Sequence, residues 1–297
     1  MLSRKSGQLS EDFYHLTFGG TSLYLLVLTD KRTMIFDGGC SAHVALLMKR
    51  LASVGLEQKL PELVFVTTLF GGRSSALHSY AGAQLLCPAG LHSSLIDALQ
   101  KGALPASDSE YSRQFVRVAN LLSKTEMDCS QISEVKPVPE GVDIELDGRC
   151  TLRIFESSGV SAVYLSGIEA VIAPPEFGLY SHNGCSVPLP AEQSAKLQPL
   201  VEALLATNFQ HLCLPFEGVL SAKLAREFLS SLLSQGRSVE REVAVAREAG
   251  VASEEIASSI REIFRSVRPP DPLLQRHRAA LESAYMSSLG LQHESAS

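Results

Sequence analysis

Short strand-like segments alternate with helical patterns over about the first two hundred residues, and this alternation limits the fold more than any other feature. The expected strands cover residues 23–28, 33–37, 63–67, 84–87, 142–146, 151–155, 162–165, 170–173 and 211–214. Helical patterns separate them at residues 42–54, 109–123 and 191–205. The segment IELDGRCTLRI, with Asp147-Gly148 at its centre, predicts a hairpin. These patterns together favour an α/β sandwich with mixed sheets.

The chain changes character after residue 220. Three further helices are expected over residues 239–249, 253–264 and 272–286, with Gly236, Gly250 and Pro269-Pro270 as breaks. We therefore expect one domain over residues 1–220 and a helical extension over residues 221–297 that serves packing or dimerisation. The segment AREAGVASEEIASSI resembles a helix-turn-helix, but Arg and Glu nearly balance there, which argues against DNA binding.

Composition excludes several classes of function. A chain of 297 residues that is 45% hydrophobic can bury one large core. No run approaches the roughly 20 apolar residues that span a bilayer, and Arg4-Lys5 is not followed by the apolar segment of a secretory signal. The formal charge of −6 argues against capture of nucleic acid. We expect a soluble, cytoplasmic protein without membrane or nucleic-acid partners.

The six cysteines are Cys40, Cys87, Cys129, Cys150, Cys185 and Cys213. They form no CxxC pair, and several stand in apolar, strand-like runs such as QLLC and HLCL. Paired spacing is what a zinc or redox site would require. We therefore expect most of these thiols to be buried as small apolar groups.

The segment LVFVTTLFGGRSSALHSY, residues 63–80, is a buried-strand pattern followed by small residues and a helix start near Arg73. It has the frame of the T-H-x-H-x-D-H junction of metallo-β-lactamase-fold proteins. The chain resembles that superfamily over about its first 220 residues, and most closely its flavodiiron and oxygen-binding diiron branch. Residues 19–39 look like the opening strand pair, RSSAL like H-S-G-S-L, and PEFG like D-A-F-G. The resemblance implies an αββα sandwich, here with a C-terminal helical extension.

The resemblance also implies where metal ligands would stand, and nearly all of them are missing. Imidazole or carboxylate is required at such positions, and a guanidinium would repel the cation. The family positions fall on Thr68, Phe70, Gly72, Arg73, Gly159, Pro175 (or Pro174) and Glu217. Only the last offers a ligand, and we expect Arg73 to pair with it.

Asp37 is present at the end of an expected strand, before Gly38-Gly39. In the family this residue is usually structural, because its hydrogen bonds tie down the ligand loop. The resemblance therefore implies a frame that keeps its shape without its metal, and no metal cofactor is expected.

Three functional hypotheses follow. The first is a pseudoenzyme that binds, senses or acts as a scaffold, as a homodimer or with a protein partner or small ligand in the vacated cleft. The second is a metal-dependent hydrolase or diiron-type oxidoreductase, with iron or zinc on a rebuilt set of Asp37, His182, Cys185 and Glu217.

The third hypothesis is metal-free chemistry, with Cys185 as nucleophile and His182 as base. The same short spacing, with Asn183-Gly184 between them, also suits a plain turn. Neither a P-loop nor a GxSxG motif occurs in the chain.

Overall fold

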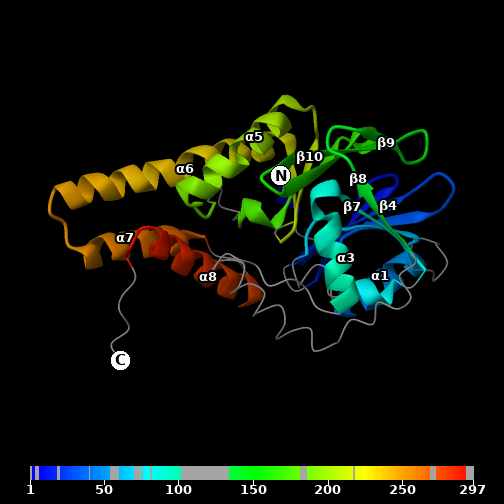
Figure 1. Ribbon diagram of the computed structural model, residues 1–297, viewed down its shortest axis with the longest axis horizontal. Coiled ribbons are helices and arrows are strands. Elements are labelled where there is room, and N and C mark those ends of the chain that lie inside the picture. The colour runs from blue at the N-terminus through cyan, green and yellow to red at the C-terminus, as the bar shows by residue number, and fades with distance from the viewer. Residues whose placement is uncertain are drawn as a thin grey trace.

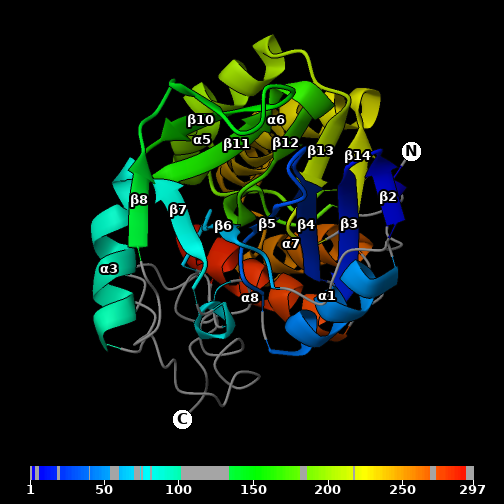
Figure 2. The same cartoon turned by 90° about the vertical axis from the view of Figure 1, so that its right-hand side faces the viewer.

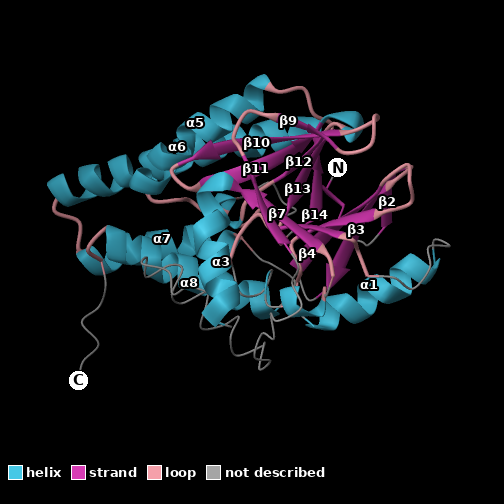
Figure 3. Cartoon of the chain, turned by 45° about the vertical axis from the view of Figure 1, so that its right-hand side comes forward, coloured by secondary structure: helices cyan, strands magenta, loops and turns pink. Residues whose placement is uncertain are grey.

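Two β-sheets face each other, and helices cover both outer faces (Figure 2 and Figure 3). This architecture comes from a computed structural model. The structure describes residues 2–3, 7–18, 21–39, 41–53, 60–69, 74, 76–80, 82–101, 134–180, 186–216, 218–267 and 272–291. Within these ranges the chain forms an αββα sandwich, which confirms the predicted mixed α/β class.

The first sheet is antiparallel over its first four strands and parallel from β5 to β8. β5 and β6 are buried throughout, as expected of strands covered on both faces. In sheet order the strands are β2 (Gly7–Ser10), β3 (Phe13–Phe18), β4 (Thr21–Val27), β5 (Thr33–Phe36), β6 (Leu63–Phe65), β7 (Gln84–Pro88) and β8 (Glu134–Val138).

The second sheet is antiparallel except where β12 lies parallel to β13. The predicted hairpin at Asp147-Gly148 is confirmed, since β9 pairs antiparallel with β10 on either side of it. In sheet order the strands are β1 (Leu2–Ser3), β14 (Gly218–Ser221), β13 (His211–Leu214), β12 (Ala170–Ile172), β11 (Val160–Leu165), β10 (Thr151–Ser157) and β9 (Asp143–Glu145).

Apolar side chains fill three layers of the sandwich. Between the sheets, Phe36 and Phe65 of the first sheet belong to the same buried cluster as Ile154 and Ile172 of the second. On the outer faces, α1 (Ser41–Ser53) and α3 (His92–Lys101) cover the first sheet, while α5 (Ala191–Ala206) and the first half of α6 (Ala222–Glu248) cover the second. Burial of these faces is the main stabilising contribution to such a domain.

The extension predicted over residues 221–297 contains α6, α7 (Ser253–Ser266) and α8 (Pro272–Ser288). Because the first half of α6 covers the second sheet, we use the name helical extension below for the second half of α6 together with α7 and α8. In Figure 1, α6 projects beyond the sandwich, and α7 and α8 return beneath it. The prediction of a break at Gly236 is wrong, because α6 runs unbroken from Ala222 to Glu248. Gly250 does mark a turn, and its φ is 76°. No helix in the described ranges is long and apolar enough to cross a membrane.

Several elements were not predicted from the sequence, namely β1, β2, β3, β8, β14, α3 and the first half of α6. β8 reads EVKPV, and its charges and Pro137 give little apolar pattern, as is common in an edge strand. α3 buries only Leu95, Ala98 and Leu99. Such weak patterns are stabilised by their neighbours in the fold. The expected helix over residues 109–123 lies outside the described residues.

Candidate functional site

The carboxyl ends of β5 and β6 and those of β10, β12 and β13 lie along one edge of the sandwich. Hydrogen bonds join the two sheets there: Ser22 N donates to Pro215 O at 2.8 Å, and the Tyr24 hydroxyl donates to Leu214 O at 2.6 Å and Gly218 O at 2.9 Å. We call this region the site edge and define it as residues 37–39, 66–69, 158–159, 173–180, 186–189, 215–216 and 218.

Asp37 holds the first sheet's part of the site edge. Its carboxylate is fully buried, and its backbone has a φ of 62°. Oδ1 accepts the Thr67 backbone N–H at 2.7 Å, and the Thr67 hydroxyl lies 3.0 Å from Oδ1 and 2.9 Å from Oδ2. Thr67, two residues after the end of β6, therefore contacts both oxygens of Asp37, and the Asp37 carboxylate holds the loop after β6 in place.

The backbone beyond Asp37 is also fixed. The Tyr80 hydroxyl donates to Gly38 O at 3.0 Å, and Ala76 N donates to Gly39 O at 2.9 Å. Thr68 is half-buried, and its carbonyl accepts the Ser74 hydroxyl at 2.5 Å. A threonine in this position offers a metal only a neutral hydroxyl, which is a poor ligand beside imidazole or carboxylate.

Gly159 lies in a two-residue turn between β10 and β11. Ser157 pairs with Val160, and the two turn residues, Ser158 and Gly159, have φ values of 51° and 77°. Both values are positive, as in the type I′ turns that connect tight hairpins. Gly159 has no side chain and Ser158 offers only a neutral hydroxyl, so this turn presents neither imidazole nor carboxylate to a metal.

Pro175 follows β12 and begins the short 3₁₀ helix η4 (Pro175–Phe177). Its ring is buried and has no lone pair for a metal. Phe70, Gly72, Arg73, His182, Cys185 and Glu217 lie outside the described residues. The pairing of Arg73 with Glu217 and the Cys185–His182 pair therefore stay predictions. Tyr24 nevertheless donates hydrogen bonds to Leu214 O and Gly218 O, the described residues at the end of β13 and the start of β14, on either side of the turn between these strands.

A buried polar cluster beside this turn was missed at the sequence level. His15 Nε2 and Ser22 Oγ are 2.9 Å apart, and the His15 ring stacks on Tyr24 with centroids 5.3 Å apart. The signal lay in FYHLTF and TSLYLLV, where alternate residues point between the sheets. A histidine hydrogen-bonded to a serine resembles a general base beside a nucleophile, but both residues are 0% exposed, so a substrate from solvent does not reach them in this arrangement.

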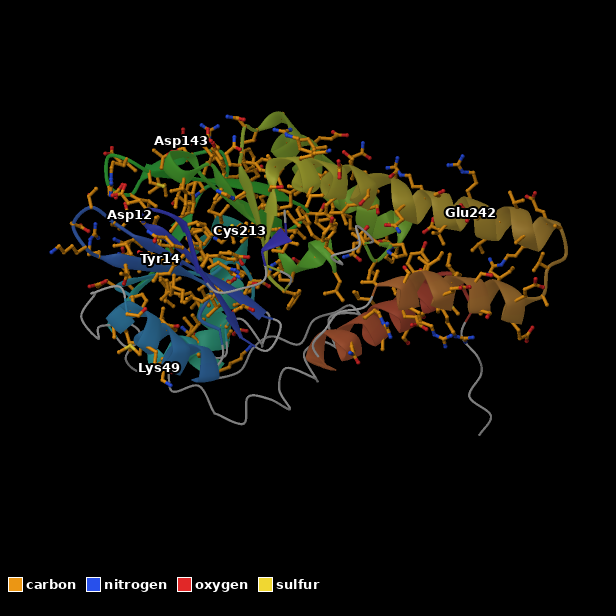
Figure 4. The ribbon with its side chains drawn as sticks, turned by 180° about the vertical axis from the view of Figure 1, so that it is seen from behind. Asp12, Tyr14, Lys49, Asp143, Cys213 and Glu242 are labelled. Carbon is orange, nitrogen blue, oxygen red and sulfur yellow. The ribbon has the colours of Figure 1, made fainter. Side chains whose placement is uncertain are left out.

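The described cysteines are unsuited to ligation or nucleophilic attack. Cys87, Cys150 and Cys213 are free and buried, which confirms the expectation for these three. Burial raises the pKa of Cys87 to about 12 and also raises the pKa values of Cys150 and Cys213. A thiol that stays protonated is a poor nucleophile and metal ligand. Figure 4 shows Cys213 in the interior of the sandwich.

The described residues do not fit a dinuclear metal centre. No three His, Cys, Asp or Glu side chains in the described ranges are arranged to hold a metal ion. Thr68, Gly159 and Pro175, at which the resemblance leads us to expect ligands, carry no imidazole or carboxylate, while the Asp37 oxygens accept hydrogen bonds from Thr67.

Comparison with solved structures identifies the fold. No protein-family model matches the sequence, and no curated protein sequence matches it. The chain is similar to a beta-lactamase domain protein from Burkholderia ambifaria, with a TM-score of 0.59, 15% identity, and coverage of 96% of this chain and 88% of that one. It is also similar to a metallo-beta-lactamase family protein from Thermus thermophilus, with a TM-score of 0.54, 16% identity and 95% coverage of both chains.

A third similar structure is BJP-1, a subclass B3 metallo-beta-lactamase of Bradyrhizobium japonicum. Its TM-score is 0.52, its identity is 13%, and the match covers 82% of this chain and 95% of that one. At such identities the likeness establishes the fold alone. The chain has the metallo-β-lactamase fold, an αββα sandwich with a helical C-terminal part.

Proposed function

We propose that this protein is a pseudoenzyme of the metallo-β-lactamase fold, with a degenerate metal site, and that it works by binding, sensing or scaffolding. The observation that carries the proposal is the two-residue hairpin turn at Ser158 and Gly159, which has no imidazole or carboxylate where the resemblance leads us to expect a histidine ligand. The engagement of Asp37 by Thr67 supports it further. In this proposal the chain has the scaffold of the fold but lacks the side chains that a metal centre would need as ligands.

The rebuilt metalloenzyme is the competing function. Its ligand set of Asp37, His182, Cys185 and Glu217 would have to draw the Asp37 carboxylate away from Thr67. Losing those hydrogen bonds inside a buried site would cost roughly 1–3 kcal/mol. No described contact favours such a rearrangement over the hydrogen bonds between Asp37 and Thr67.

Metal content tests the proposal directly. Tag-free protein, expressed with iron, zinc and manganese supplements and freed of loosely bound ions, is analysed for these three metals. A zinc-binding protein of the same fold, carried through the same preparation, is the positive control. We expect less than about 0.1 equivalent of metal per chain, because a degenerate site cannot hold an ion through the washing. A structural or catalytic site would keep its metal, since it binds the ion tightly.

One or two equivalents that survive washing would overturn the pseudoenzyme proposal. Loss of that metal in a His182→Ala variant, with retention in a Ser230→Ala variant on the exposed face of α6, would then assign the rebuilt set.

A partner remains part of the proposal, either a second copy of the chain or another protein or small ligand. The described side chains of the extension place their large apolar groups inward, with Val245 of α6 an exception at 59% exposed. A homodimer formed by the extension would therefore use a mainly polar surface, typical of weak association. Light scattering over a range of concentrations measures it, and a mass that stays monomeric would exclude it.

A further inference from the structure

The helical extension packs against the site edge. One continuous buried cluster contains Leu179, Val187 and Phe216 of the site edge together with residues of α6, α7 and α8. Phe216 directly precedes Glu217, and Leu179 lies just beyond η4. The three edge side chains are 0%, 1% and 6% exposed. Apolar side chains of the site edge are therefore removed from water by the chain itself.

A series of direct contacts leads from α7 through α8 and α6 to the site edge. The rings of Phe264 in α7 and Tyr285 in α8 lie 5.6 Å apart between centroids. The Tyr285 hydroxyl donates to Gly236 O in α6 at 3.3 Å. Gly236 in turn packs so closely on the backbone of Leu189 that a Cβ there would lie 2.0 Å from the Leu189 oxygen.

Polar contacts fix the same segment to α6. The Ser186 hydroxyl donates to Gln235 Oε1 at 2.7 Å, and Gln235 Nε2 donates back to Ser186 O at 3.2 Å. The Glu240 carboxylate accepts the backbone N–H of Ala191, at the first residue of α5, at 2.7 Å. Residues 186–191 are thus held by the stretch of α6 on which α8 packs.

α7 is amphipathic, and its apolar face packs into the buried cluster that the extension shares with the site edge. Ile256, Ile260 and Phe264 are buried in the cluster, while Glu254, Glu255, Glu262 and Arg265 are exposed. Figure 1 shows α7 and α8 on the same side of the molecule, beneath the projecting part of α6. The hydrophobic effect therefore favours the packed arrangement, and the charged face remains in water.

We propose that α7, α8 and the second half of α6 form a cap that closes the site edge, and that cap and edge open together as one unit. A ligand of the edge then binds only to the open form, so that binding shifts the cap from closed to open. The cap is an autoinhibitory contact within the chain. It deepens the proposed binding function but does not depend on the metal content.

Hydrogen exchange of the full chain, followed by NMR, tests the coupling. Phe264→Ala weakens the cap without altering a site-edge residue, and Glu262→Ala on the exposed face of α7 is the matched control. The readouts are the Val187 amide, which donates to Leu179 O at 3.1 Å, the amides of α8, and those of β11 as an internal reference. We expect Phe264→Ala to speed exchange of Val187 and of α8 by the same factor, about tenfold or more, and Glu262→Ala to change neither.

Faster exchange in α8 with an unchanged rate at Val187 would overturn the proposal, because the cap would then open without the edge. If Phe264→Ala accelerates β11 as well, the whole chain is unfolding. Ile260→Val then replaces it, with an expected common factor of about two to ten. The metal analysis and the exchange experiment have separate readouts, so either proposal can fail alone.

Discussion

Asp37 and Thr67 show at the level of single residues how a buried carboxylate is accommodated. A buried charge is tolerated when hydrogen bonds replace its hydration. The Thr67 backbone N–H and hydroxyl supply two of these donors, at 2.7 to 3.0 Å. The pair fixes the loop after β6 relative to the end of β5, so this part of the site edge is held by hydrogen bonds.

Replacing Thr67 by valine tests these hydrogen bonds. The change Thr67→Val keeps the backbone donor and nearly the same volume but removes the hydroxyl that lies between the two carboxylate oxygens. We expect a loss of about 1–3 kcal/mol in the free energy of unfolding, measured with urea. Thr29→Val, at an exposed hydroxyl that makes only a long contact of 3.4 Å with Asp147 O, is the control and should change stability by less than about 0.5 kcal/mol. Equal effects of the two variants would show that the hydroxyl does not support Asp37.

The role of a residue could be predicted from the sequence only where that role does not depend on a partner distant in the chain. Asp37 could be singled out because the family resemblance implies a structural role for this position, at the end of an apolar strand before two glycines. The His15 and Ser22 pair could not, since the two residues meet only after β3 and β4 pair, and each alone reads as a polar residue in a strand. Thr67 likewise looked like the end of a strand, and its partner lies 30 residues away.

At the level of elements, α6 joins the sandwich to the cap. Its first half packs on the second sheet through Phe228 and Leu229, and its second half belongs to the extension cluster through Val239 and Val243. Gly236 lies between these two stretches, at the close approach to Leu189. A glycine normally weakens the interior of a helix, but here it permits the close contact with the Leu189 backbone.

The variant Gly236→Ala separates helix propensity from packing. Propensity alone would make α6 more stable by about 1 kcal/mol. The added Cβ would instead lie 2.0 Å from the Leu189 oxygen, which is backbone and cannot rotate away. We therefore expect a net loss of about 1–3 kcal/mol in thermal or urea unfolding. Ser230→Ala on the exposed face of α6 is the control and should be neutral or slightly stabilising. A stabilised Gly236→Ala variant would contradict the close approach.

At the level of the whole molecule, hydrogen bonds join the two sheets at both ends of the sandwich. The site edge is joined through Ser22 and Tyr24, and the opposite end through Asp147, whose carboxylate accepts the backbone N–H groups of Thr29, Arg149 and Cys150 at 2.8 to 3.1 Å. Arg149 also pairs with Asp12 at 2.9 Å. Figure 4 shows Asp12 at this end, far from Glu242 on the projecting part of α6.

The hydrogen bonds to the Asp147 carboxylate predict that the stability of the protein depends on pH. Partial burial acts to raise the pKa of Asp147, but the N–H donors of Thr29, Arg149 and Cys150 outweigh it, and the pKa lies below its ordinary value. A carboxyl whose pKa is lower in the folded state stabilises the fold above its unfolded pKa, near 4, and this contribution is lost as pH falls through the folded pKa.

We therefore expect Asp147→Asn to lower the midpoint of urea unfolding at pH 7, and we expect the difference from the wild type to shrink as the pH falls below about 4. Glu227→Gln on the exposed face of α6 is the control and should run parallel to the wild type. A constant difference between Asp147→Asn and the wild type across this range would contradict the assignment.

The sequence by itself determined the class of the fold, and its resemblance to the family predicts that ligand-forming residues are missing at most of the metal positions. Apolar periodicity is local, so the central strands and the last two helices could be read from it, and residue identity decides which side chains lack a lone pair. Only the tertiary structure decided that α6 is continuous, that Asp37 is bonded to Thr67, and that the extension covers the site edge. Each of these depends on contacts between residues distant in sequence, which no local pattern specifies.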